Sequence, residues 1–155
     1  MFRRIGLILG MSLAVAAWAG AAGTGGGPLT SHTPLLTPEL KSRLAQADLD
    51  AGARYFERKC SQCHDGAKEG GHGKGPHLWN IMGRKAATAP GFVYSAAMKQ
   101  AATTWSYATL DYYLADTERA IPDRAMNFSG IQDDQLRANV VAYLRTLNDA
   151  PPPLP

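Results

Sequence analysis

One short motif, Cys60-Ser61-Gln62-Cys63-His64, constrains this chain more than any other feature. The spacing C-x-x-C-H is a signature of covalent haem attachment. Two thiols at this spacing can add to the two vinyl groups of one porphyrin edge, and the histidine that follows can then reach the iron. The chain has only these two cysteines, too few for a disulfide framework. The motif therefore predicts a fold built around one covalently held haem, with His64 as an iron ligand.

Two other uses of a cysteine pair fit the sequence less well. A structural zinc site usually takes four ligands from two such pairs, and the remaining histidines form no second pair. A thioredoxin-like redox pair belongs near a βαβ unit, and the sequence contains no convincing strand pattern. Haem attachment is therefore the interpretation that the motif favours.

The first 22 residues have the layout of a secretory signal peptide. Arg3 and Arg4 begin it, an uncharged apolar stretch covers residues 5–19, and residues 17–19 read Ala-Trp-Ala, a small-x-small cleavage pattern. As a helix this stretch would span about 22 Å, less than the ~30 Å hydrocarbon core of a bilayer. Cleavage is therefore favoured over an uncleaved membrane anchor. We expect a periplasmic protein, soluble in the first case and tethered at its N-terminus in the second.

Turn-forming residues divide the rest of the chain. Residues 23–47 are a Gly- and Pro-rich linker with a helical extension expected over residues 38–47, and His32 within it is expected to be solvated. Residues 48–149 form the haem domain, and the Pro-rich residues 150–155 end the fold. Apolar periodicity predicts helices over residues 48–59, 95–102, 107–116 and 133–147.

The long segment over residues 66–90 is rich in Gly, Pro, His and Lys. A loop of that length is unusual in a compact domain unless it packs against something other than protein. We therefore expect an all-α fold of about four to five short helices with long loops wrapped around one haem. In the first helix Leu49, Ala53 and Phe56 are predicted to share the buried face.

Three methionines, Met82, Met98 and Met126, could supply the sixth iron ligand. Met98 is expected in a short helix, where it packs in the core, and Met82 in an apolar loop, where it packs on the porphyrin ring. Met126 lies in a loop between the last two long helices, and Pro122 and Gly130 bracket that loop. A His/Met pair raises the reduction potential. It also closes both axial positions, which suits electron transfer better than oxygen chemistry.

Further short segments follow the motif in order: Gly75-Pro76-His77-Leu78, Gly83-Arg84-Lys85, Ala89-Pro90-Gly91-Phe92-Val93-Tyr94, Trp105, Ile121-Pro122, Met126, Phe128-Ser129-Gly130-Ile131 and Ala142-Tyr143-Leu144. Met126 falls 62 positions after His64. In this combination the chain resembles a class I cytochrome c of the mitochondrial and α-proteobacterial branch over residues 48–148. The resemblance implies an electron carrier, and no enzymatic activity.

The resemblance also implies roles for residues on the His64 side of the haem. Pro76 is expected to accept the free ring N–H of His64 through its carbonyl. Tyr94 and Trp105 are expected to hydrogen-bond a haem propionate, and Arg84 to add positive charge there.

On the opposite side, Tyr113 is expected near the sulfur of Met126, and Phe128 is expected to screen the haem from solvent. In the helical part, Gly52 and Phe56 are expected to cross the last helix near Val140 and Tyr143. The implied cofactor-binding residues are Cys60, Cys63, His64, Pro76, Arg84, Tyr94, Trp105, Tyr113, Met126 and Phe128, with His64 and Met126 as the metal ligands.

Two residues depart from the family pattern. Met98 stands where an asparagine is usual near a propionate and a buried water, and Arg124 stands where a threonine usually supports the methionine loop. Both affect the expected internal water network, and with it the reduction potential and the strength of the Met126–iron bond.

The formal net charge of +3 includes Arg3 and Arg4, and residues 48–149 carry twelve Lys and Arg against twelve Asp and Glu. Nucleic acid is therefore not an expected partner, and any steering toward a partner would come from a charge dipole. Four residues are expected to ring the exposed haem edge: Lys59, Lys74, Lys85 and Arg124.

The resemblance implies that a quinol–cytochrome c oxidoreductase donates the electron. A terminal oxidase or, in a phototroph, a reaction centre would accept it. A monomer with a small, salt-sensitive interface suits such transient contacts. Two alternatives remain. A peroxidase-like or nitric-oxide-handling haem enzyme needs an open sixth position, against which Met126 argues. A sensor or haem subunit of a larger complex would be favoured by a retained anchor.

Overall fold

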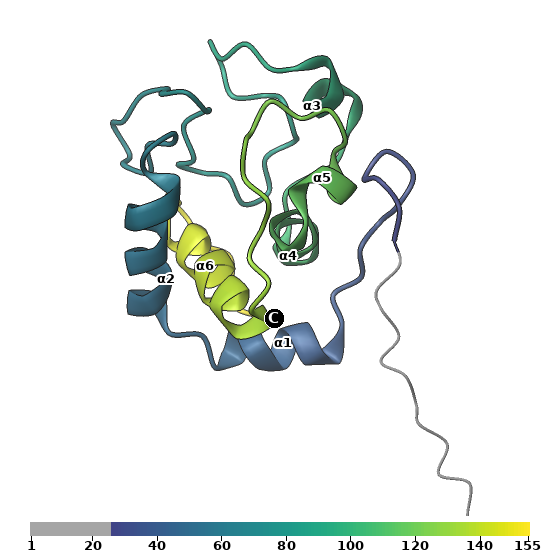
Figure 1. Cartoon of the computed structure of the whole chain (residues 1–155). Coiled ribbons are helices and arrows are strands. Elements are labelled where there is room, and N and C mark those ends of the chain that lie inside the picture. Colours follow the sequence, from purple (N-terminus) through teal and green to yellow (C-terminus); the bar gives the residue numbers. More distant parts are fainter. Residues whose placement is uncertain (1–25) are drawn as a thin grey trace, which may run out of the picture.

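The structure, a computed structural model that describes residues 26–155, is all-α within that range, which confirms the predicted fold class (Figure 1). Among these residues no β-strand forms. Two isolated bridges pair His64 with His72 and Lys85 with Thr104. The elements in chain order are α1 (Pro38–Ala45), α2 (Leu49–Tyr55), the π-helical turn η1 (Phe56–Cys60), α3 (Ala96–Gln100), α4 (Tyr107–Ala115), α5 (Thr117–Ala120) and α6 (Asp134–Thr146).

Short polar side chains begin each of the six α-helices. In every case the residue before the helix accepts the main-chain N–H of the residue three positions further on, which pairs a donor that the helix leaves free. The observed helices match the predicted ranges closely, except that the first one ends in the wider turn η1. The short helix α5 was not predicted. The capping residues are Thr37, Asp48, Ser95, Ser106, Asp116 and Asp133.

Helices α2 and α6 cross side by side and form the centre of one half of the core (Figure 1). A Cβ atom on Gly52 would lie 2.3 Å from the carbonyl oxygen of Asn139, so a larger residue would push the two helices apart. The ring of Phe56 lies 5.4 Å from that of Tyr143. These contacts confirm the expected crossing. The prediction that Leu49 shares the buried face is wrong: this residue, at the first position of α2, is 40 % exposed, whereas Phe56 is buried.

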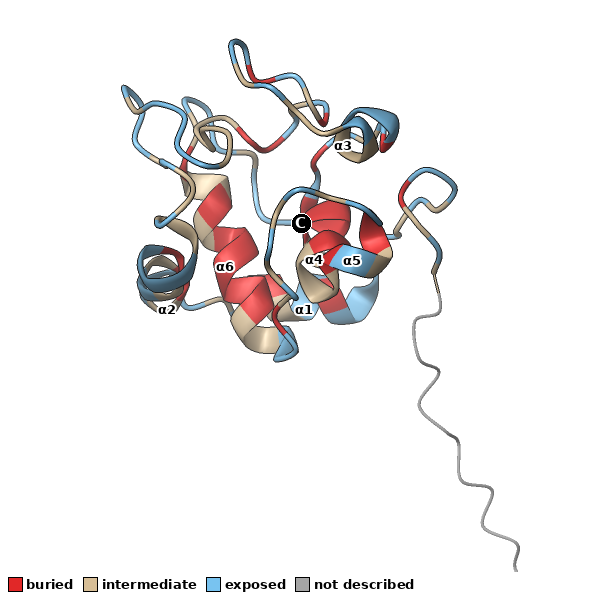
Figure 2. Ribbon diagram, turned by 45° about the horizontal axis from the view of Figure 1, so that its top comes forward, coloured by how far each residue is buried: buried red, intermediate tan, exposed pale blue. Residues whose placement is uncertain are grey.

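The described part of the predicted linker packs on the domain. Leu29 is buried, and its N–H donates to the carbonyl of Ala120 at 2.9 Å. His32, expected to be solvated, is half-buried with its ring 4.8 Å from the ring of Tyr112. Helix α1 then runs beneath α6 with Leu44 fully buried (Figures 1 and 2). Within residues 26–155 no helix is both long and apolar enough to cross a bilayer. The predicted signal segment, residues 1–22, lies outside the described residues.

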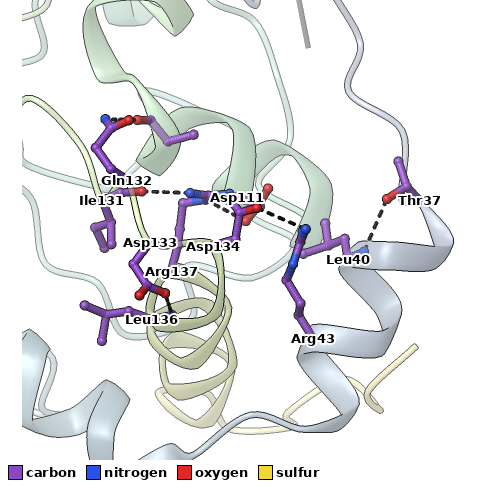
Figure 3. Close-up of polar contacts among 11 residues, drawn as sticks. Thr37, Leu40, Arg43, Asp111, Ile131, Gln132, Asp133, Asp134, Leu136 and Arg137 are labelled. Atoms are coloured by element: carbon purple, nitrogen blue, oxygen red, sulfur yellow. Dashed lines mark hydrogen bonds and ion pairs between the residues drawn. The ribbon is translucent and has the colours of Figure 1, made fainter. Parts of the chain in front are cut away.

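A cluster of charges joins α1, α4 and α6 (Figure 3). Arg137 of α6 is buried and donates to Asp111 at 2.8 Å, to Asp134 at 2.6 Å and to the carbonyl of Ile131 at 2.7 Å. Arg43 of α1 pairs with Asp134 at 3.0 Å. Burial raises the pKa of Asp111, and the neighbouring guanidinium of Arg137 partly offsets this. Because separating a buried ion pair leaves an unmatched charge, the cluster fixes how these three helices meet.

Helix α1 gives a direct test of whether the N-terminal segment belongs to the core. Leu44 is 0 % exposed, so Leu44→Ala should lower the free energy of unfolding of the haem-loaded protein by about 2–4 kcal/mol. Leu35 of the same segment is 78 % exposed, so Leu35→Ala should change it by less than about 0.5 kcal/mol. Denaturant titration measures both. Equal small effects would show that this segment is not part of the folded core.

Candidate haem site

The cysteine motif forms one tight turn at the end of a helix. The carbonyl of Cys60 accepts the N–H groups of Cys63 at 3.0 Å and of His64 at 2.9 Å. Just before it, the N–H of Ser61 donates to the carbonyl of Phe56 five residues back, the spacing of a π-helical turn, which is frequent at functional sites. Both cysteines are half-buried and free of any disulfide. Two thiols and an imidazole therefore project from a single turn.

The thiol of Cys60 is held in its neutral form. Burial raises the pKa of Cys60 to about 11, with a smaller contribution from Cys63. A thiol in this state is protonated at neutral pH, so Cys60 lacks the lowered pKa of a reactive redox cysteine. Among the described residues no group of three or more His, Cys, Asp or Glu side chains could hold a metal ion.

The ring of His64 is held from one side by the loop that follows it. Its Nδ1 lies 2.7 Å from the carbonyl oxygen of Pro76, the contact that the resemblance implies. The N–H of Gly75 donates to the carbonyl of Cys63 at 2.8 Å, and a Cβ on Gly75 would lie 2.3 Å from the imidazole. Burial lowers the pKa of His64, although the bond to Pro76 acts in the opposite direction. With Nδ1–H directed at Pro76, the neutral ring keeps its Nε2 lone pair for a metal.

Met126 lies in the loop between α5 and α6, as predicted. The hydroxyl of Tyr113 donates to the sulfur of Met126 at 3.8 Å, and the N–H of Phe128 donates to the Met126 carbonyl at 3.1 Å. Burial raises the pKa of Tyr113 to about 12, so its hydroxyl keeps its proton at neutral pH. Met98 is half-buried against the core, in line with the packing role expected of it, and Met82 is buried in the same core.

Main-chain pairing brings Arg84 and Trp105 together. The N–H of Trp105 donates to the carbonyl of Arg84 at 2.9 Å, and the N–H of Gly83 donates to the carbonyl of Trp105 at 2.7 Å. The buried ring of Trp105 lies 5.2 Å from the ring of Tyr113. Trp105 therefore connects the loop after the cysteine motif to the helix that faces Met126.

The expected roles of Arg84 and Tyr94 toward a propionate are accompanied by main-chain contacts. The guanidinium of Arg84 donates to the carbonyls of Trp79 at 3.2 Å and His77 at 2.9 Å. Burial lowers the pKa of Arg84. The hydroxyl of Tyr94 accepts the N–H of Ala89 at 3.2 Å, which leaves its proton for another acceptor. Arg84 and Tyr94 thus brace the loop as well as carrying groups that suit a carboxylate.

A cavity of about 710 Å³ opens at Cys63 and His64, with Phe56, Tyr143 and Leu147 in its wall. Met126 does not line it. The cavity therefore lies beside the motif and is not the space between the two predicted axial ligands.

One residue predicted on the exposed haem edge is half-buried instead. Arg124, expected on the rim of the haem edge, has a side chain only 10 % exposed and forms an ion pair with Glu118 of α5. The rim prediction is wrong for Arg124 because its guanidinium is engaged with the carbonyl of Phe128 as well as with Glu118. Glu118 and its neighbour Thr117, whose hydroxyl donates to Phe128, were missed. An acidic residue two positions after the capping Asp116 is a helix-start signal that could have located them.

A sequence model of the family described as "Cytochrome c" matches residues 49–148, which is more than half of the chain. The chain belongs to the cytochrome c family. It is 44 % identical over 98 residues to the cytochrome c of Chlamydomonas reinhardtii, a match covering 63 % of this chain and 88 % of that protein. The corresponding identity to the cytochrome c of Sesamum indicum is 41 %, with the same coverage of both chains.

A bacterial relative matches a longer part of this cytochrome. The protein named "Cytochrome c homolog" of Bradyrhizobium diazoefficiens is 35 % identical over 147 residues, covering 94 % of this chain and 77 % of that protein. That alignment reaches beyond the limits of the family match. It therefore includes much of the N-terminal segment that packs on the haem domain.

Cytochromes of this family bind haem c, which contains iron, covalently. They carry electrons and are not enzymes. The residues present fit that group. Cys60 and Cys63 offer two thiols on one turn, and His64 offers an imidazole whose Nδ1 is occupied. The haem supplies the redox chemistry, and the polypeptide supplies attachment, orientation and exclusion of water.

The glycine beneath His64 gives a test of how the ring is held. Gly75→Ala places a methyl group 2.3 Å from the imidazole as it stands, so the ring must shift and its bond to Pro76 must weaken. We expect a partial loss of the low-spin haem spectrum. Gly71→Ala is the matched control, because a Cβ there meets nothing within 4 Å. Identical spectra for the two variants would contradict this account of the ring.

Proposed function

We propose that this cytochrome is an exported electron carrier whose haem iron is ligated by His64 and Met126. One contact pattern supports the proposal above all. His64 is fixed at Nδ1 by Pro76, which frees Nε2, while the sulfur of Met126 lies against the hydroxyl of Tyr113 in a separate loop. An imidazole and a thioether are therefore each oriented by their own hydrogen-bond partner.

A closed pair of axial positions suits outer-sphere electron transfer. A thioether ligand stabilises ferrous haem and raises the reduction potential, and neither ligand needs to leave when the electron moves. A haem enzyme would need an open sixth position with an acid–base residue beside it. His72 and His77 are engaged instead with carbonyl groups of Pro90 and Ala67. These contacts support a role for both histidines as structural loop residues.

The proposed location is the periplasm, with residues 1–22 acting as a cleaved signal peptide. The proposed electron donor is a quinol–cytochrome c oxidoreductase, and the acceptor is a terminal oxidase or a reaction centre. Three lysines support a docking rim: Lys59, Lys74 and Lys85 are exposed, and none of them forms an ion pair within residues 26–155. Lysine charges of this kind raise the rate of encounter with an acidic partner and lose that effect in salt.

The methionine ligand is tested by comparing two substitutions. Met126→Ala in the ferric cytochrome should abolish the weak far-red charge-transfer band that marks sulfur bound to haem iron. It should also lower the reduction potential, because the ligand that favours ferrous iron is gone. Met98→Ala removes a half-buried methionine outside the ligand loop and should keep the band. A band that survives Met126→Ala would exclude Met126 as the ligand.

A further inference from the structure

The guanidinium of Arg124 closes the loop that carries Met126. Arg124 stands two residues before Met126, and its Nη2 donates to the carbonyl of Phe128, two residues after Met126, at 3.1 Å. Its Nη1 pairs with Glu118 of α5. The hydroxyl of Thr117, also in α5, donates to the same Phe128 carbonyl. Residues 124–128 are thus closed by one of their own side chains and fastened to a helix.

The ion pair is shielded from solvent at its Arg124 end and exposed at its Glu118 end. The Arg124 side chain is 10 % exposed, whereas that of Glu118 is 64 % exposed. The Nε of Arg124 is buried without a hydrogen-bond partner. A buried cation that lost its two remaining contacts would be strongly unfavourable. The two contacts therefore favour one closed arrangement of the loop.

Helix α5 is itself held in place from its other end. The carbonyl of Ala120 accepts the N–H of Leu29 at 2.9 Å, and Leu29 belongs to the N-terminal segment that precedes the family match. The hydroxyl of Tyr112 in α4 donates to the carbonyl of Gly27 at 2.7 Å in the same segment. The helix to which Arg124 fastens the loop is therefore a fixed support.

We propose that Arg124 is a positioning residue that keeps the Met126 loop closed and so keeps the Met126 sulfur in place at the iron. This inference rests on the proposed ligation by Met126. Arg124 acts through the carbonyl of Phe128 and through α5, and it does not act as a ligand. Arginine is suited to the task because its planar fork can serve two acceptors at once, whereas a lysine ammonium is a compact point charge.

An ordinary stabilising ion pair would behave differently from a loop closure. Loss of an ordinary pair lowers the stability of the whole fold and leaves the iron ligands in place. Loss of a loop closure raises the rate at which Met126 leaves the iron. The rate at which imidazole replaces Met126 on the ferric cytochrome measures that opening, and the far-red sulfur–iron band reports the ligand at rest.

The experiment compares four variants of the mature haem protein. Arg124→Ala should speed imidazole binding by about tenfold, which corresponds to about 1.4 kcal/mol. Arg124→Lys and Glu118→Gln should give smaller increases, because each keeps part of the contact. Arg43→Ala is the matched control: it removes an arginine–carboxylate pair with Asp134 that joins α1 to α6 and does not include the Met126 loop. It should lower stability and leave the imidazole rate unchanged.

Two results would overturn the proposal, and they are distinguishable. If the unaltered protein lacks the sulfur–iron band, Met126 is not the ligand, and the positioning role falls with it. If the band is present but Arg124→Ala and Arg43→Ala bind imidazole at the same rate, the ligation stands and the loop closure does not. If Arg124→Ala yields no haem-loaded protein, the imidazole rate of Glu118→Gln decides the question. That variant keeps the guanidinium and neutralises its partner. An unchanged imidazole rate in Glu118→Gln would then count against the closure.

Discussion

The hydrogen bond between Nδ1 of His64 and the carbonyl of Pro76 links the two kinds of structure in this protein. On one side is a helix end, where the Cys60 carbonyl gathers the motif into a turn. On the other is a long loop without regular structure. The bond fixes the tautomer and the plane of the imidazole. Because the Pro76 carbonyl belongs to the loop, the ring is fixed only if the loop keeps its shape. The paired main chain around Arg84 and Trp105 provides that support.

The helices support this arrangement by positioning the cysteine turn and the residues around Met126. Helices α2 and α6 meet at Gly52, where close approach of the main chains positions the cysteine turn. Helix α4 carries Tyr113 toward Met126, and the charge cluster around Arg137 ties α4 to α6. The N-terminal segment with α1 extends this framework beyond the part that matches the family. In this cytochrome the framework is therefore larger than the shared haem domain.

Much of this could be predicted from the sequence, since the haem motif, the capping residues and the apolar spacing of α4 and α6 are local signals. The failures have physical causes. Leu49 follows the helical period but is exposed at the first position of α2, and the period alone does not show how much of an apolar face its neighbours cover. Arg124 carries a charge typical of surfaces, yet its guanidinium is engaged with the Phe128 carbonyl and with Glu118 of an unpredicted short helix. The composition of residues 23–37 indicated a linker, although a few apolar residues such as Leu29 are enough to dock its described part.

The central claim is that this chain is built around one haem held by Cys60, Cys63 and His64. The most direct test is the intact mass, with an absorption spectrum, of the protein exported in a host that matures c-type cytochromes. The account predicts the mass of the processed chain plus one haem, a low-spin ferrous spectrum, and loss of both in a Cys60→Ser, Cys63→Ser double variant. A protein that folds in that host without covalent haem would contradict it.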